Sequence, residues 1–540
     1  MIAILSLWLW NSLACRTVID AEDGILVVSQ EQQVSWQRVF NPFLVNGSAR
    51  WPTTAGIYEP LLIFNPMTGE YTPWLATTHQ FNEDASILSL EIRENVYWSD
   101  GRPLTVEDVR FTFEYMKQHP ALDNQGLWHN LHKIETEGSS VIFYFTNPCF
   151  SGLERLAHQV IVPKHIWQDI DQPLEFTNPN PIASGPFTEV SAFTSQSWTL
   201  ERNPYYWQEL GIQGLQFPAL PSNEQATLAL LQDEVDWAGN FIPAIDRIFV
   251  DTNPEYHHYW FPLVGASVLL YPNHKRYPFD DVNVRKAISY AIDRALLVKV
   301  ALHNYSQPAD ESGLSNAYDA WKSPNWSQRE KWTTYDPQKS LALLKEAGWL
   351  PNKDGILSKD DRRLEVEIAV VSGWSDWVRA AQVVARSLQK IGIDASVKNQ
   401  DFGSWFQNLQ NGNFDLSLGW SQEGPTPIPF YQSMLSEKSV TEVGTAAAIN
   451  WHRYGHSGSD SLIEQFESTS DPSTQLQIVH NLQDAFVQNA PALPLFLNPS
   501  WGEFNDSRIT GFPSAENPYA RLSPNHGPEA LLVLTRLQKR

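Results

Sequence analysis

Residues 58–113 read YEPLLIFNPMTGEYTPWLATTHQFNEDASILSLEIRENVYWSDGRPLTVEDVRFTF. Within this stretch, residues 87–92 alternate apolar and polar side chains, which predicts a half-buried strand. Asp100-Gly101 is a turn dipeptide, since glycine tolerates a positive φ. Thr105 and Asp108 then stand three residues apart, the spacing of a capping box at a helix start. Strand, turn and helix thus follow one another closely, which predicts a mixed α/β fold.

The same alternation continues on both sides of this stretch, without an internal repeat or a low-complexity tract. Residues 24–29 (GILVVS) are typical of a buried parallel strand. Apolar residues over 284–300 share one helical face, so we expect one core-facing helix there. Ion pairs along that helix are expected for Arg285 and Arg294. Residues 341–348 (LALLKEAG) predict an amphipathic helix that ends at a glycine.

The composition narrows the possible functions. With 540 residues, the chain is long enough for three to four domains or for fewer large ones. Its 61 acidic residues outnumber its 38 basic ones, and a net charge of −23 argues against nucleic-acid binding. The 22 tryptophans outnumber the 18 tyrosines, an excess that favours flat apolar ligands, sugars among them.

The N-terminal segment indicates export. Its first fourteen residues, MIAILSLWLWNSLA, form an uncharged apolar run that is too short to span a bilayer and resembles the core of a signal peptide. Leu13-Ala14-Cys15 is similar to the end of a bacterial lipobox, although Ser12 replaces the usual leucine and no basic residue precedes the run. We expect residues 1–15 to be a signal peptide with Cys15 as the lipid attachment site. Cleaved soluble secretion and a retained anchor are the alternatives.

No motif points to catalysis or to a metal. The chain has no G-x-S-x-G and no P-loop motif, and its paired carboxylates lack a glycosidase pattern. His257-His258 and the pair His452 and His456 have metal-compatible spacings but no recognisable further ligands. Cys149 has no basic neighbours, which predicts a buried small apolar side chain. We therefore expect no cofactor, no metal and no enzymatic activity.

Residues 58–113 resemble the signature region of the family 5 extracellular solute-binding proteins of ABC importers, the oligopeptide-, nickel- and oligosaccharide-binding group. Further segments that are similar to this family recur in its order: SGPF (184–187), RNPYYW (202–207), LLQDEVDWA (230–238), YPFDDVNVRKAISYAIDR (277–294), YDPQKSLALLKEAGW (335–349), FDLSLGW (414–420) and ENPYA (516–520).

The resemblance implies an α/β, two-lobed periplasmic-binding-protein fold with an extra α/β domain on one lobe. It implies lobe 1 from residues 16–56, 184–270 and 494–540, the extra domain from 57–183, and lobe 2 from 271–493. It also implies hinge closure on a ligand between the lobes. The expected protein is an exported monomer, in the periplasm or on the outer face of the cytoplasmic membrane, that delivers its ligand to an ABC permease.

The family that the chain resembles binds several classes of ligand, so the ligand class depends on particular segments. In oligopeptide-binding members, an Asp a few residues beyond the counterpart of Trp420 pairs with the peptide ammonium. Here the chain reads Trp420-Ser421-Gln422-Glu423, so that acid is displaced or replaced, although Glu423 could substitute. Residues 40–43 (FNPF), 236–243 (DWAGNFIP) and 512–520 (FPSAENPYA) resemble the cellobiose- and β-glucan-binding branch.

We therefore expect an oligosaccharide ligand, a β-linked disaccharide or short β-glucan, bound by aromatic platforms and neutral polar groups. An oligopeptide is the alternative ligand, and a secreted carbohydrate-active enzyme is the alternative class. The tryptophans expected at loops or strand ends, together with the polar candidates, give these ligand-binding residues: Trp36, Trp51, Asn240, Trp260, Trp405, Trp420, Gln422, Glu423, Trp451 and Trp501.

Overall fold

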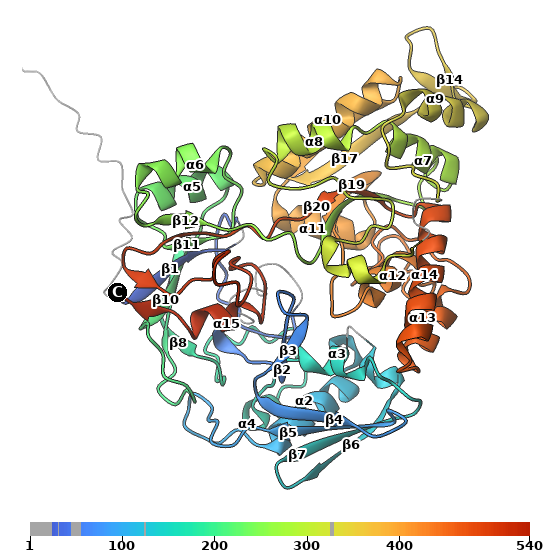
Figure 1. Ribbon diagram of the computed structural model, residues 1–540. Helices are drawn as coiled ribbons and strands as arrows, with labels where there is room; N and C mark the ends of the chain where they lie inside the picture. The colour runs from blue at the N-terminus through green and yellow to red at the C-terminus, as the bar shows by residue number, and fades with distance from the viewer. Residues whose placement is uncertain (1–23, 31, 45–55, 124–125, 325–328) are drawn as a thin grey trace, which may run out of the picture.

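The computed structural model describes residues 24–30, 32–44, 56–123, 126–324 and 329–540. Figure 1 shows two lobes side by side, with a third unit below them that carries β4 to β7. The chain therefore has the two-lobed, mixed α/β architecture that the sequence predicts. The predicted signal peptide with Cys15, and also Trp51, lie outside the described residues.

Lobe 1 is built on a seven-stranded sheet with the order β12-β21-β11-β1-β10-β9-β8. Its central strand, β1 (Ile25–Ser29), pairs in parallel with β10 and β11 and is buried along its whole length, as the GILVVS pattern predicts. The other strands are β8 (Phe187–Phe193), β9 (Ser197–Arg202), β10 (Gly214–Pro218), β11 (Trp237–Ala238), β12 (His257–Tyr259) and β21 (Glu503–Asn505).

Lobe 2 is built on a five-stranded sheet with the order β18-β17-β19-β13-β20. Its strands are β13 (Ser267–Pro272), β17 (Glu365–Val371), β18 (Asp394–Gln400), β19 (Leu416–Trp420) and β20 (Leu493–Leu497). The helices α8 (Arg294–Ala301), α10 (Ser375–Lys390) and α11 (Phe402–Asn411) pack on this sheet. Apolar residues recur every three to four positions in α10, so one of its faces is buried in the lobe core.

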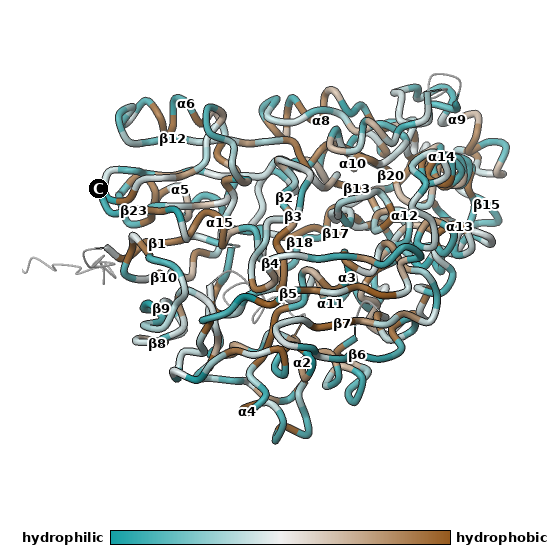
Figure 2. The backbone as a smooth tube through the Cα atoms, turned by 60° about the horizontal axis from the view of Figure 1, so that its bottom comes forward, coloured by the Kyte–Doolittle hydropathy of each residue, from teal (hydrophilic) through white to brown (hydrophobic). Residues whose placement is uncertain are grey.

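The unit below the lobes carries a four-stranded antiparallel sheet, β4-β5-β7-β6. Its strands are β4 (Ala76–Phe81), β5 (Ile87–Ile92), β6 (Leu131–Glu137) and β7 (Ser140–Phe145), and α2 (Val106–Gln118) packs on it. The predicted strand and capping box are confirmed, since the Asp108 carboxylate accepts a hydrogen bond from the Thr105 N–H at 2.9 Å. Figure 2 shows apolar stretches along β1 and β7 and polar loops around the outside.

The remaining elements lie between or around these sheets. They include β2 (Leu62–Asn65), β3 (Glu70–Pro73), α3 (Gly152–Ala157), α4 (Lys164–Trp167), α5 (Asn223–Leu231), α6 (Ile245–Ile248), α7 (Val282–Tyr290), α9 (Pro337–Glu346), α12 (Ile428–Leu435), α13 (Ser459–Glu467), α14 (Pro472–Asn489) and α15 (Ala530–Leu534). The small sheets are β14-β15-β16 (350–363) and β22 (Ile509–Thr510) with β23 (Gln538–Lys539). Among the described helices, none combines the length and apolar character that crossing a bilayer requires.

Two connections cross between the lobes (Figure 1). The chain leaves the lobe 1 sheet after β12 and enters the lobe 2 sheet at β13, so residues 260–266 form the first connection. It returns between β20 and β21 through residues 498–502. The predicted boundaries after residues 270 and 493 fall inside β13 and β20. The predicted division of the chain into domains, with its exact boundaries, stays a prediction.

The single helix predicted over 284–300 is wrong, because the chain forms two helices, α7 and α8. Asp293 starts the second helix, and its carboxylate accepts a hydrogen bond from the Leu296 N–H at 2.9 Å. The break turns Leu296 outward, and 42% of its surface is exposed. The helix ending at Gly348 is confirmed, with a φ of +89° at that glycine.

The two arginines of this segment also differ from expectation. Arg285 and Arg294 are buried, and they bind backbone carbonyls rather than carboxylates. The Arg285 Nε donates to the Ala490 oxygen at 3.0 Å, and the Arg294 Nε donates to the Pro494 oxygen at 2.7 Å. These charge-assisted hydrogen bonds fix α7 and α8 to the chain around β20, a long-range contact that sequence spacing does not reveal.

Candidate functional site

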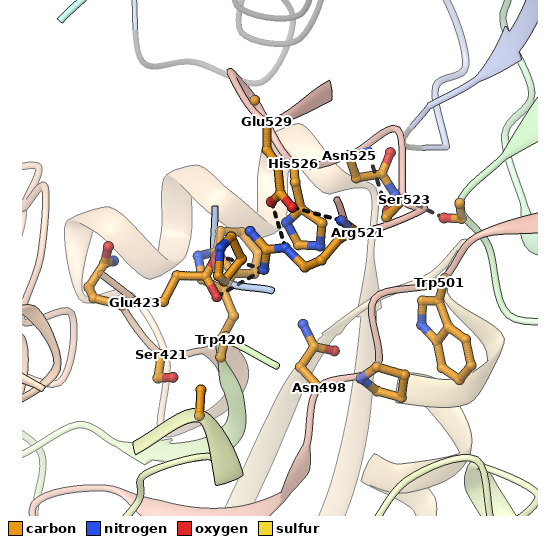
Figure 3. Close-up of a pocket in the computed structure, with 18 of the residues that line it drawn as sticks. Trp420, Ser421, Glu423, Asn498, Trp501, Arg521, Ser523, Asn525, His526 and Glu529 are labelled. Atoms are coloured by element: carbon orange, nitrogen blue, oxygen red, sulfur yellow. Dashed lines mark hydrogen bonds and ion pairs between the residues drawn. The ribbon is translucent and has the colours of Figure 1, made fainter. Parts of the chain in front are cut away.

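A cavity of about 650 Å³ lies where the two lobes and the lower unit meet. The first connection contributes Gly265, and the second contributes Asn498 and Trp501. Figure 3 shows side chains from several distant segments pointing into this space. The volume is in the range of small-molecule binding sites, and an interdomain position is typical of them.

Lobe 2 forms an aromatic wall, which we define as Trp374, Trp377 and Trp420. Trp420 ends β19, while Trp374 and Trp377 stand at the start of α10, where a three-residue spacing places both on one side. The ring centroids of Trp374 and Trp377 are 4.9 Å apart, and that of Trp420 lies 6.3 and 6.4 Å from them. Three indole rings therefore form one continuous apolar surface of the cavity.

A second layer of rings lies behind Trp420. Phe406 stacks on it with a centroid distance of 5.9 Å, while Trp405 and Trp451 pack against it at 5.5 and 5.7 Å. The fully buried Trp405 donates its Nε1–H to the Ser417 hydroxyl at 3.1 Å. These contacts hold the Trp420 ring in place, which limits the entropy that a ligand would have to remove.

Four of the predicted tryptophans do not line the cavity. Trp405 lies inside α11 and not in a loop, so that expectation is wrong, and both it and Trp451 belong to the core of lobe 2. Trp36 is buried edge-on against Trp198, with ring centroids 5.8 Å apart. Trp260 packs on the core of lobe 1. Apolar burial explains the position of Trp36, Trp405 and Trp451, and Trp260 is partly buried.

The opposite wall, from lobe 1, is polar. Asn240 is 1% exposed, and its Nδ2 donates to the Thr227 hydroxyl at 3.3 Å, but its Oδ1 has no partner among the described residues. Asn525 donates to the Gly239 oxygen at 2.9 Å, and its Oδ1 likewise has none. Buried acceptors without a partner are costly, so both amides fit a ligand that donates hydrogen bonds.

A buried arginine lies between two glutamates at this wall (Figure 3). The Arg521 Nε donates to the Glu529 carboxylate at 2.7 Å, and its Nη1 donates to the two Glu423 oxygens at 3.0 and 3.2 Å. Burial alone would lower the pKa of Arg521, but the two carboxylates raise it above its ordinary value. Arg521 is therefore charged and fully compensated within the protein.

The other titratable groups of the cavity are also satisfied internally. Burial raises the pKa of Asp376 to about 6, and the Asn223 Nδ2 donates to its carboxylate at 3.4 Å. Burial lowers the pKa of His158 to about 4, and its Nε2 accepts a hydrogen bond from the Phe64 N–H at 3.2 Å. Burial also lowers the pKa of His526, which contacts the Ser500 hydroxyl at 3.1 Å. At neutral pH both histidines are uncharged.

The structure thus brings five of the predicted residues to one cavity: Asn240, Trp420, Gln422, Glu423 and Trp501. Sequence reasoning missed Trp374, Trp377, Arg521 and Asn525. The Trp374-x2-Trp377 spacing at a helix start was the one available signal for two of them. Nothing local marks Arg521 and Asn525 as cavity residues, because Glu423 and Gly239, which they contact at the cavity, are far away in the sequence.

The histidines considered as metal ligands are bound to the protein instead. The His257 Nδ1 contacts the Phe249 oxygen at 3.0 Å, and the His452 Nε2 contacts the Met434 oxygen at 3.1 Å. In the described part of the chain, no three His, Cys, Asp or Glu side chains are grouped to hold a metal. Cys149 is a buried free thiol, as predicted.

A two-lobed fold with a cavity at the interlobe contact defines a ligand-binding protein. Residues 70–442 match the family model described as bacterial extracellular solute-binding proteins, family 5 Middle, and the chain belongs to this family. It is an exported solute-binding protein of an ABC importer. The periplasmic oligopeptide-binding protein OppA of Salmonella typhimurium is 22% identical, over 89% of this chain and 90% of its own. The nickel-binding periplasmic protein of Escherichia coli is 24% identical, over 70% and 72%.

Solved structures share the fold. The mannohexaose-bound form of a Thermotoga maritima protein, titled a periplasmic oligopeptide-binding protein, superposes with a TM-score of 0.90 at 24% identity and covers 96% of this chain and 99% of its own. NikZ of Campylobacter jejuni in complex with Ni(L-His) gives a TM-score of 0.81 at 20% identity, with coverage of 96% and 100%. One fold therefore accommodates very different ligands, and the cavity itself has to indicate the ligand class.

Proposed function

We propose that this protein captures a short oligosaccharide, such as a β-linked disaccharide or short β-glucan, and delivers it to an ABC permease. The observation that carries the proposal is the combination of an aromatic wall with a polar wall whose one arginine is paired with two carboxylates. Sugars present apolar C–H faces and several hydroxyls, which such walls match. The mannohexaose-bound relative adds support that this fold can hold a hexose chain.

Specific residues have roles in this proposal. Trp420 and Trp501 stack on or border the sugar rings, while Asn240 and Gln422 bind hydroxyls. Glu423 lines the cavity, but its carboxylate is not free to bind the ligand, because Arg521 donates hydrogen bonds to both of its oxygens. Trp36, Trp260, Trp405 and Trp451 have structural roles, and no catalytic role is proposed for any residue.

An oligopeptide is the second candidate, because several relatives are named as peptide-binding proteins. A peptide brings an ammonium and a carboxylate, and a buried charge needs a counter-charge. The acid closest to the peptide-type position, Glu423, is engaged by Arg521, and Arg521 is engaged by two acids. These contacts favour an uncharged ligand over a zwitterionic one.

Calorimetry of the full mature chain with cello-oligosaccharides, manno-oligosaccharides and a mixture of tri- to pentapeptides tests the proposal. We expect saturable heat with at least one sugar series and none with the peptides. Peptide binding without any sugar response would falsify the proposal in favour of the second candidate. Assaying the same sugars for new reducing ends tests the enzyme alternative, and we expect none.

We also propose that Cys15 carries a lipid that holds the monomer at the membrane, an idea that rests on the apolar run before it. The wild type, expressed behind a basic N-terminal extension, should partition into detergent, whereas Cys15→Ser should stay in the aqueous phase. Equal partitioning of the two proteins would exclude the lipid anchor.

A further inference from the structure

We propose that Glu423 determines specificity, because as the counter-ion of Arg521 it makes the cavity reject acidic sugars and accept uncharged ones. This inference rests on the proposed function and names the ligand class more narrowly. It starts from the place of the two residues in the fold. Glu423 follows β19 of lobe 2, whereas Arg521 lies in the C-terminal segment that has returned to lobe 1. Their ion pair therefore joins the two lobes across the cavity (Figure 3).

The loop that carries Glu423 is anchored on both sides. Before it, the Ser421 N–H donates to the Ser267 oxygen at 2.9 Å, and the Ser267 N–H donates to the Ser421 hydroxyl at 2.8 Å. After it, the Tyr318 hydroxyl donates to the Gly424 oxygen at 2.8 Å and accepts from the Gly424 N–H at 3.0 Å. Glu423 is therefore held toward Arg521 by its neighbours and does not reach it by chance.

A glycine makes room for the ion pair. Gly265, in the first connection between the lobes, has a φ of +110°. A Cβ atom at this position would lie 2.0 Å from a Glu423 carboxylate oxygen and 2.8 Å from the Arg521 Nη1. Any other residue would therefore push the pair apart and strain the backbone. Three distant segments thus fit together at one point, and the result is a compensated arginine.

The charges of this cluster determine which ligands fit. Arg521 contributes one positive charge, while Glu423 and Glu529 contribute two negative ones, so the cluster repels a carboxylate that enters the cavity. A uronate would have to compete with Glu423 for Arg521 while both lobes close around it. Without the Glu423 carboxylate, the Arg521 Nη1 would keep only the Val264 oxygen, at 3.5 Å, as an acceptor, and a uronate carboxylate could replace Glu423 through charge-assisted hydrogen bonds. The chain thus holds an arginine suited to acidic sugars but occupies it with its own acid.

The test compares a neutral sugar with its uronate in calorimetry on the mature chain. The probe is whichever cello- or manno-oligosaccharide binds best, together with its counterpart in which one hydroxymethyl group is a carboxylate. We expect the wild type to bind the neutral sugar about tenfold or more tightly than the uronate, since like charges disfavour the wrong partner. Glu423→Gln should reduce this ratio about tenfold or invert it. Glu346→Gln, the same charge change at the exposed end of α9, should leave the ratio unchanged.

Gly265→Ala keeps both charges but separates them, so it should also lower the preference for the neutral sugar over the uronate. Thermal melting shows whether Glu423→Gln and Gly265→Ala remain folded. An unchanged ratio in the folded variants, or a wild type that binds both sugars equally, would overturn the inference and leave the proposed function intact. A wild type that binds peptides and no sugar would overturn both.

Discussion

The two walls of the cavity differ in chemistry and in how they are built. The lobe 2 wall consists of three indole rings from β19 and the start of α10, backed by a second layer of rings. The lobe 1 wall consists of amides and an arginine from segments that are far apart in the sequence. Stacking depends on contact area, whereas hydrogen bonds depend on where each hydroxyl points. We therefore expect the aromatic wall to supply most of the affinity and the polar wall most of the selectivity.

The largest expected effect comes from Trp420→Ala. Losing this ring should remove about 1–3 kcal/mol of binding free energy, so the Kd should rise by about 5- to 150-fold. The melting temperature should also fall, because Phe406 and Trp451 pack against the same ring. Calorimetry with the best sugar ligand and thermal melting measure both effects.

Trp405→Phe is the matched control, since Trp405 lies in the same cluster but is fully buried behind Trp420. It should lower stability and leave the Kd nearly unchanged. If Trp420→Ala behaved in the same way, Trp420 would be a core residue only, and the division of roles between the walls would be lost.

Asp376 lies between Trp374 and Trp377 in the sequence and lines the cavity, and it predicts a pH dependence of stability. Its pKa in the folded state is about 6, above the ordinary value of 3.8. The contribution of the protonated Asp376 to the free energy of unfolding is fully present below about pH 4. It is lost as the pH rises through 6, because the folded protein disfavours the ionised form. The loss should be on the order of 1–3 kcal/mol.

Asp376→Asn should remove this step from a plot of unfolding free energy against pH, as measured with denaturant between pH 4 and pH 7. Asp354→Asn, at an exposed aspartate, serves as the control and should leave the step in place. A step that persists in Asp376→Asn would assign it to another group.

A smaller effect is expected from Asn240→Ala. Because the buried Oδ1 has no partner in the part of the chain that the structure describes, we expect a ligand hydroxyl to donate to it. Losing one hydrogen bond of about 1 kcal/mol should raise the Kd roughly fivefold for sugars that carry this hydroxyl and leave deoxy analogues unaffected. Calorimetry with a deoxy-sugar series measures the difference. An equal loss for every sugar would contradict a role in selectivity.

The smallest effect should come from a contact outside the cavity. Arg155 of α3 forms an ion pair with Glu467 of α13, and the Phe150 N–H donates to the Glu467 oxygen at 2.8 Å. This pair joins the lower unit to lobe 2, so Arg155→Gln should favour an open arrangement in which lobe 2 is separated from the lower unit. Partly exposed pairs are worth at most about 1 kcal/mol, so we expect a two- to fivefold rise in the Kd through faster ligand release.

Arg110→Gln breaks an ion pair inside the lower unit and is the control, with no expected change in ligand release. Stopped-flow measurement of the dissociation rate compares the two variants. Equal rates in both would mean that the α3–α13 contact does not contribute to closure.

The fold was predictable where local patterns determine structure. The strand at 87–92, the capping box at Thr105 and β1 follow from periodicity and side-chain chemistry over a few residues. The helix over 284–300 was wrong because the apolar period continues through the break that Asp293 caps. Periodicity reports which side is buried, but it does not show where the backbone stops being helical.

The candidate site was predictable only in part. Trp420 and Glu423 follow directly from the end of a predicted strand, where ligands commonly bind. Trp405 looked similar in the sequence but faces the core, because its helix turns it inward. The partner of Glu423 lies 98 residues further along the chain, so that pairing depends on the tertiary fold alone.

The order of strands in lobe 1 also affects how the protein is made. β1 and β21 are both neighbours of β11, although about 475 residues separate them in the sequence. A ribosome must therefore synthesise nearly the whole polypeptide before this sheet can close, whereas lobe 2 is encoded in one uninterrupted stretch. During synthesis the nascent chain keeps β11 and β12 without β21, the strand that pairs with both. For an exported protein, this delay leaves time for translocation before the first lobe is complete.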